Sequence, residues 1–113
     1  MDKLTDFFKM LTDETRLRIL VLLYHKKLCV CQLCGIMEET QPKISKHLAK
    51  LRDTGFVKVE RKEQFIYYYL NLDNKMYDVI LKNIVDNFQN FEILKSDVEK
   101  IDTADKFLNV CNC

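Results

Sequence analysis

The sequence is poor in residues that interrupt helices, and it lacks any segment that could cross a membrane. Its 113 residues include two glycines, one proline and no tryptophan, a composition that favours helices over a turn-rich β fold. No run of about 18 apolar residues is present, which excludes a bilayer-spanning helix, and no signal peptide opens the chain. We therefore expect one cytoplasmic domain over residues 1–113, without membrane contact.

The chain has five cysteines, any of which could be a nucleophile, but it has no glycine-rich loop. A thiol-dependent reductase would need a cradle for its oxyanion beside the nucleophile, and neither a glycine-rich loop nor an arginine flanks the cysteines. We therefore expect no enzymatic activity. In a cytoplasmic protein the cysteines are expected to be thiols, and an odd number cannot pair completely within one chain.

Basic residues are concentrated in one stretch, although the net charge is only +1. Residues 43–62 contain seven lysines and arginines against two acids, whereas the rest of the chain has 11 basic and 15 acidic residues. A basic patch on an acidic body indicates a localised contact with a polyanion such as nucleic acid. A solvated helix face would give the same local charge, so this alternative stays open.

The spacing of apolar residues predicts five helices, a β-hairpin and a weak sixth helix. Apolar positions recur every three to four residues in segments 4–11, 13–25, 30–39, 41–54 and 73–91, which is typical of amphipathic or buried helices. Residues 57–60 alternate between apolar and charged, and residues 65–70 are aromatic or β-branched, which predicts two strands. This order is that of a mainly α winged helix-turn-helix, with the two-helix motif at about 29–54 and the wing at 56–70.

Polar residues mark the ends of these helices. The predicted N-caps are Thr12 or Asp13, Thr40 and Asp73, and a capping box at Ser96 predicts the start of the last helix. Gly55 is predicted to end the fourth helix as its C′ residue.

The predicted fourth helix has an apolar face for the core and a polar face for DNA. Ile44, Leu48 and Leu51 share one arc of the helical wheel, as the recognition helix of a helix-turn-helix requires. Three residues near its start are expected to reach base edges, namely Gln41, Ser45 and Lys46. Phosphate contacts are expected from Lys43, His47, Lys50 and Arg52. For His47 a partly buried packing role stays open as the alternative. The wing is expected to touch flanking DNA through Arg61, Lys62 and Gln64.

The segment LCVCQLC, residues 28–34, places three cysteines within six positions. Cys31 and Cys34 lie on one helix face, and Cys29 joins them only if the first turn of the helix is irregular. Zinc prefers four tetrahedral ligands, and no fourth ligand is nearby, so the three sulfurs suit a trigonal-pyramidal, thiophilic ion such as trivalent arsenic or antimony, without an organic cofactor. A thiol redox switch and plain buried sulfur remain alternatives. Cys111 and Cys113 could form a second soft-ion site or an end without function.

The first and fifth helices offer more apolar surface than a core of this size needs. Helix-turn-helix proteins usually read two half-sites as dimers. We therefore expect a homodimer formed through residues of about 1–12 and 73–92.

From about Asp13 to Leu70 the sequence resembles the ArsR/SmtB family of metal-sensing winged-helix repressors. The resemblance is carried by DETRLRIL, LCVCQLC, QPKISKHLAKLRDTGFV and the hairpin ending in FIYYYL, and LCVCQLC matches the arsenic-binding box of the arsenical-resistance repressors. It implies a dimer that holds operator DNA when empty and releases it when Cys29, Cys31 and Cys34 capture trivalent arsenic or antimony. Relatives that sense zinc, cobalt or nickel use histidines in the fifth helix, and this chain has none after His47.

Overall fold

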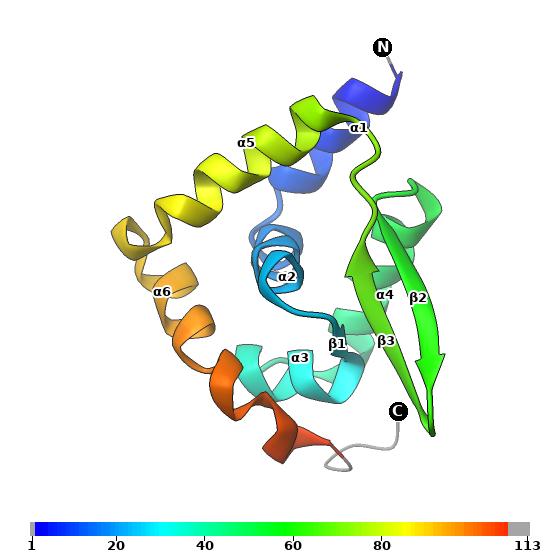
Figure 1. Cartoon of the computed structure of the whole chain (residues 1–113), viewed down its shortest axis with the longest axis vertical. Coiled ribbons are helices and arrows are strands. Elements are labelled where there is room, and N and C mark those ends of the chain that lie inside the picture. The colour runs from blue at the N-terminus through cyan, green and yellow to red at the C-terminus, as the bar shows by residue number, and fades with distance from the viewer. Residues whose placement is uncertain (1, 109–113) are drawn as a thin grey trace.

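The computed structural model describes residues 2–108, whose helices surround a central helix and carry a small sheet at one side (Figure 1). The elements follow in the order α1 (Asp2–Leu11), α2 (Glu14–His25), β1 (Leu28–Cys29), α3 (Val30–Met37), α4 (Gln41–Asp53), β2 (Val57–Lys62), β3 (Phe65–Leu70), α5 (Lys75–Asp86), η1 (Phe88–Asn90), α6 (Glu92–Glu99) and η2 (Ile101–Phe107). The predicted mainly α winged helix-turn-helix is confirmed. No helix within the described residues is long and apolar enough to cross a membrane.

Helix α2 lies at the centre of the molecule (Figure 1) and is apolar on nearly all sides. The side chain of Asp13 caps it by accepting the Arg16 backbone N–H at 3.1 Å, as the sequence predicts. Five consecutive residues of α2, from Ile19 to Leu23, are buried. Burial of each such aliphatic side chain contributes about 1.5–3 kcal/mol, so α2 is the main organiser of the core.

The helix-turn-helix consists of α3 and α4. Ile44, Leu48 and Leu51 of α4 are fully buried, which fixes the side of the helix that faces the body. Gly55 follows α4 with a φ of +86°, and the Phe56 N–H then donates to the Leu51 carbonyl at 3.1 Å. A left-handed residue at this position ends a helix and favours glycine, so the predicted end of α4 is confirmed.

The three strands form an antiparallel sheet in the order β1-β3-β2. The predicted hairpin of β2 and β3 is present, and its two-residue turn has Glu63 at a φ of +58° in place of a glycine. Strand β1 was not predicted. It places Leu28 opposite Tyr68 and Cys29 opposite Tyr67, so the thiol segment begins as the edge strand of the wing sheet.

The C-terminal third departs most from the prediction. Helix α5 ends at Asp86 and not at Phe91, because the chain turns through η1 and leaves Phe91 52% exposed. Its cap is Asn74, whose side chain accepts the Met76 N–H at 2.8 Å, whereas the predicted cap Asp73 faces Lys3. Helix α6 begins at Glu92, so the predicted start at Ser96 is wrong.

A candidate DNA-binding surface and thiol cluster

The polar face of α4 is open to solvent in most positions. Among the predicted DNA-binding residues, Lys43, Lys46, Lys50, Arg52, Arg61, Lys62 and Gln64 are exposed. Gln41, Ser45 and His47 are half-buried. The Lys43 ammonium lies 3.1 Å from the Glu39 carboxylate, so it already has an acidic partner one turn before it. The exposed lysines and arginines of this predicted set lie on α4 and at the tip of the wing. These are the two elements that enter or flank a DNA groove in this fold.

His47 differs from the other residues of this group. Its side chain is only 11% exposed, and its Nε2 lies 3.9 Å from Oδ1 of Asp13. Burial lowers the pKa of His47 below its ordinary value, against the opposing charge of Asp13. The imidazole is therefore mainly neutral at pH 7, and the contact with Asp13 is not an ion pair there. The predicted phosphate contact of His47 stays a prediction, and this environment disfavours it.

The contact with His47 also affects the pKa of Asp13. Burial by itself would raise the pKa of Asp13, but the hydrogen bond from the Arg16 N–H and the charges of His47 and Arg16 lower it overall. The carboxylate of Asp13 therefore stays ionised well into the acidic range. Its negative charge interacts favourably with the positive N-terminal end of the α2 dipole.

The three cysteines occupy the start of α3. Cys29 is the N-cap residue in an extended conformation, and Cys29 and Cys31 are each 3% exposed. Cys29 and Cys34 are free thiols. Cys31 is disulfide-bonded, so the expectation that every cysteine is a thiol is wrong for Cys31. That expectation followed from the redox compartment alone, which does not say which sulfurs a fold brings together. Cys111 and Cys113 lie outside the described residues.

The cysteines share a short segment without forming a ready-made ion site. Within residues 2–108, no group of three or more His, Cys, Asp or Glu side chains is close enough to hold a metal ion. Burial, and then the charge of Cys29, raise the pKa of Cys34. A soft ion would therefore have to displace thiol protons and to draw Cys29 from its capping position.

A cavity of about 270 Å³ connects the thiol segment with the candidate DNA-binding surface. Its lining includes Cys29, Gln41 and Ser45 of α4, and Arg61 and Gln64 of the wing. The sequence did not predict this cavity, because it depends on the edge strand β1. One wall of it is the N-cap of α3, so a change at Cys29 alters the space between α4 and the wing.

Gln32 is a site residue that sequence analysis missed. It is 1% exposed, and its Oε1 accepts the backbone N–H of Cys29 at 3.1 Å. Together the two residues form a capping box. The signal was a glutamine three positions after the cap, but cysteine is not among the usual N-cap residues.

Comparison with known proteins supports this reading of the fold. The profile described as "Bacterial regulatory protein, arsR family" matches residues 13–59. An arsenic resistance transcriptional regulator of Pseudomonas putida is 43% identical over 74% of this chain and 67% of its own length. The chain belongs to the ArsR family. The matched profile and the matched relative are described as a regulatory protein and a transcriptional regulator, and neither is described as an enzyme.

Two other ArsR-like proteins agree with this assignment. The arsenical resistance operon repressor of Escherichia coli is 46% identical over 57% of this chain and 56% of its own length. The structure titled "Reduced HlyU from Vibrio cholerae N16961" has a TM-score of 0.69 at 28% identity, over 77% of this chain and 90% of that chain. The chain thus spans between 56% and 67% of the length of the first curated ArsR relatives it matches.

Proposed function

We propose that the protein is a metalloid-responsive repressor that binds operator DNA as a homodimer and releases it when trivalent arsenic or antimony binds Cys29, Cys31 and Cys34. The observation that carries the proposal is the shared cavity, which is lined both by Cys29 and by Gln41 and Ser45 of α4. The names of the matched relatives add support, because two of them are arsenic or arsenical resistance regulators.

The chemistry needs three reduced sulfurs and no further reagent. Arsenite exchanges its three hydroxyl groups for three thiolates, so three As–S bonds replace three As–O bonds and the thiol protons leave as water. The product is a trigonal pyramid that needs no fourth ligand. Because Cys31 is disulfide-bonded in the structure, this bond must be reduced before capture.

Release of DNA follows from the position of Cys29. Capture draws the N-cap of α3 toward Cys31 and Cys34, and this changes the wall that α3 shares with α4 and the wing. By linkage, operator DNA weakens arsenite binding by the same factor that arsenite weakens operator binding. A coupling of about 3 kcal/mol corresponds to about a hundredfold change in operator affinity.

Dimer formation is supported by exposed apolar side chains on α1 and α5, two helices that cross in Figure 1 and meet where the Phe7 ring stacks on Tyr77. Phe8 of α1 and Met76 and Val79 of α5 are 46%, 44% and 46% exposed. Exposed large apolar side chains on two helices that touch each other are candidates for an interface. A second copy that covers this face places two α4 helices on one duplex, as palindromic half-sites require.

The test is an operator-binding titration with the fully reduced protein and the promoter of its own gene. Arsenite should weaken wild-type binding about a hundredfold, whereas C29S, C31S and C34S should keep operator affinity and lose the response. The C111S/C113S double variant tests the predicted second site and should respond like wild type. The proposal is wrong if the arsenite-loaded wild type binds as tightly as the unloaded form, or if each single serine variant no longer binds DNA.

A redox-sensing repressor is the second candidate, and the disulfide-bonded state of Cys31 favours it. Oxidation would then change operator affinity, and a dithiol reductant would restore it. Titration of the reduced protein with oxidant in the absence of arsenite separates the two functions. A change with oxidant and none with arsenite would replace the first proposal with this one.

A further inference from the structure

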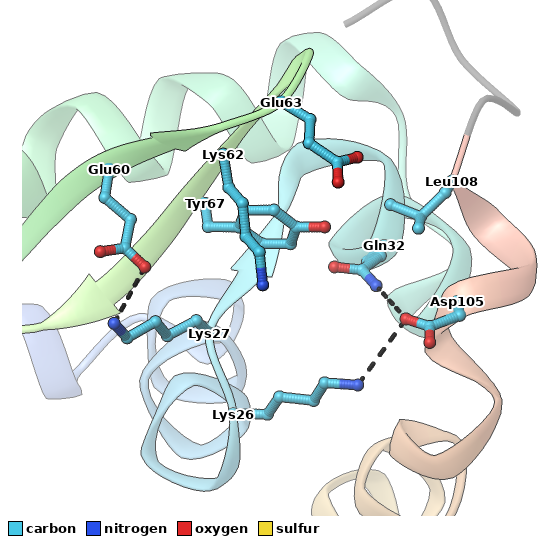
Figure 2. Close-up of a pocket in the computed structure, with 9 residues that line it drawn as sticks. All are labelled: Lys26, Lys27, Gln32, Glu60, Lys62, Glu63, Tyr67, Asp105 and Leu108. Atoms are coloured by element: carbon cyan, nitrogen blue, oxygen red, sulfur yellow. Dashed lines mark hydrogen bonds and ion pairs between the residues drawn. The ribbon is translucent and has the colours of Figure 1, made fainter.

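The N-terminal half of α3 is held by the last described turn of the chain. Gln32 accepts the N–H of Cys29 with Oε1, and its Nε2 donates to Oδ1 of Asp105 in η2 at 3.1 Å. In Figure 2 the Gln32 amide and the Lys26 ammonium both point toward the same carboxylate oxygen of Asp105, beside a cavity whose volume is about 480 Å³. Gln32 therefore connects the N-cap cysteine to Asp105, a residue 73 positions after Gln32 in the chain.

Two apolar contacts keep η2 in this place. Ala104 is fully buried, and Phe107 lies against Gly35 so closely that a methyl group added to Gly35 would overlap the ring. A glycine at this position of α3 thus lets η2 approach the helix backbone. The position of Asp105 is set by this packing and not by its own exposed side chain, which is 78% accessible.

The other end of α3 is held more firmly. Arg18 donates to the Met37 carbonyl at 3.1 Å and forms a bidentate pair with Asp97 at 2.7 and 2.9 Å. The Lys100 ammonium also donates to the Ile36 carbonyl at 3.2 Å. One end of the helix is therefore fixed by buried charge. Once the disulfide of Cys31 is reduced, the other end is held by the pairing of β1 with β3, by a neutral amide and by a single exposed carboxylate. Movement on capture is expected at the second end.

We propose that Gln32, oriented by Asp105, is a positioning residue that holds Cys29 in the N-cap and so limits its access to soft ligands. The C-terminal turn η2 would then set the inducer sensitivity of the thiol site. For Cys29 to join the face of Cys31 and Cys34, its N–H must leave Gln32. While Asp105 holds the Gln32 side chain in place, movement of Cys29 breaks the hydrogen bond from its N–H to Gln32. Without Asp105, the Gln32 side chain is free to move with Cys29 or to turn away from it, so the movement costs less. The link to inducer sensitivity rests on the proposed function, whereas the restraint on Cys29 does not.

The first experiment measures this restraint without arsenite. Fully reduced protein is treated with iodoacetamide, and the alkylation rates of Cys29 and Cys34 are followed by mass spectrometry, with Cys34 as the internal reference. D105A should raise the Cys29-to-Cys34 rate ratio about three- to tenfold, as expected for the loss of one hydrogen bond. D105N keeps an acceptor oxygen and should stay within about twofold of wild type.

Matched variants separate the hydrogen bond from charge. D102A removes an exposed acid of the same turn, and K26A removes the cation that lies 3.7 Å from Asp105. Both should react like wild type. Hydrogen exchange at the Cys29 amide should become faster in D105A and stay unchanged in D102A. Equal Cys29 rates in D105A and wild type, or an equal increase in D102A, would overturn the proposal.

The second experiment links the restraint to the inducer. Arsenite affinity of the DNA-free protein should rise in D105A by about the same factor as the Cys29 rate, while operator affinity without arsenite stays within about twofold. A loss of operator affinity equal to the gain in arsenite affinity would show a merely structural role and overturn the proposal. If wild type does not bind arsenite but D105A still exposes Cys29, the proposed function fails and the restraint stands.

Discussion

The two ends of α3 are held to the rest of the protein by different kinds of contact. At the C-terminal end the contacts are buried and charged, since Arg18 and Asp97 are 7% and 1% exposed. The hydrogen bond to Asp97 raises the pKa of Arg18, so the guanidinium keeps its positive charge. At the N-terminal end the carboxylate of Asp105 is exposed, and water can replace it at little cost. In the reduced protein, without the disulfide of Cys31, this helix is therefore fixed where it meets the core and adjustable where the cysteines lie.

Removal of Asp97 is expected to have the largest effect on stability. D97A leaves the buried Arg18 guanidinium without its partner, and such a change typically costs about 3–5 kcal/mol. Urea unfolding should show this loss, while E99A, an exposed acid of the same helix, should change stability by less than about 0.5 kcal/mol. A loss below about 1 kcal/mol for D97A would mean that the two ends of α3 are held equally weakly.

A smaller effect is expected at the same end from Lys100. K100A removes hydrogen bonds to the Ile36 carbonyl and the Glu38 carboxylate, and we expect a loss of about 1 kcal/mol. Thermal unfolding measures the effect, and K95A on the exposed face of α6 is the control. The alkylation rate of Cys29 should not change. If it rises as in D105A, the ends of α3 are not independent.

The Gly35→Ala variant probes the adjustable end from the helix side. Alanine favours the helix by about 1 kcal/mol over glycine, but its methyl group overlaps the Phe107 ring and must displace η2. We expect the free energy of unfolding to change by less than about 1 kcal/mol, while Cys29 becomes more reactive. In the double variant G35A/F107A the overlap is gone, so stability should not fall below that of F107A alone. If the double variant is less stable than F107A, the added methyl group destabilises the protein through a contact other than the Phe107 ring.

The smallest expected effect concerns the pH dependence of stability at α4. Because the pKa of His47 is lower in the folded protein than its ordinary value of 6.5, the unfolded chain binds the proton first. Stability should therefore fall as the pH drops below about 6.5 toward the folded pKa, and level off below it. Unfolding of H47Q and wild type between pH 7.5 and about 5 should show a shallower decline for H47Q. Parallel declines would exclude this role of His47.

The sequence predicted the elements that repeat a pattern and missed those that depend on distant partners. The stripe of Ile44, Leu48 and Leu51 and the C′ position of Gly55 follow from local spacing, and both are present. Strand β1 has two residues, and only its pairing with β3 defines it. The predicted start at Ser96 is wrong because Asp97 is a buried partner of Arg18 in the middle of α6, and helix signals do not report such pairs.

The candidate site shows the same limit. The exposed lysines of α4 and the position of the cysteines could be predicted, because both follow from helical geometry. The cavity beside Cys29 and the contact of Gln32 with Asp105 could not be predicted, because each joins segments far apart in the chain. For His47 the sequence left a phosphate contact and a partly buried packing role open, and its low exposure agrees with the second.

The register of β1 has a consequence for the wing. Cys29 is the last residue of the edge strand β1 and lies opposite Tyr67 of β3. Movement of Cys29 into α3 would therefore separate β1 from β3. The remaining β2–β3 hairpin would be a two-stranded ribbon, a form that is only marginally stable by itself. If the proposed capture occurs, movement of Cys29 would then affect both candidate DNA-contacting elements, the helix α4 and the β2–β3 hairpin, at the same time.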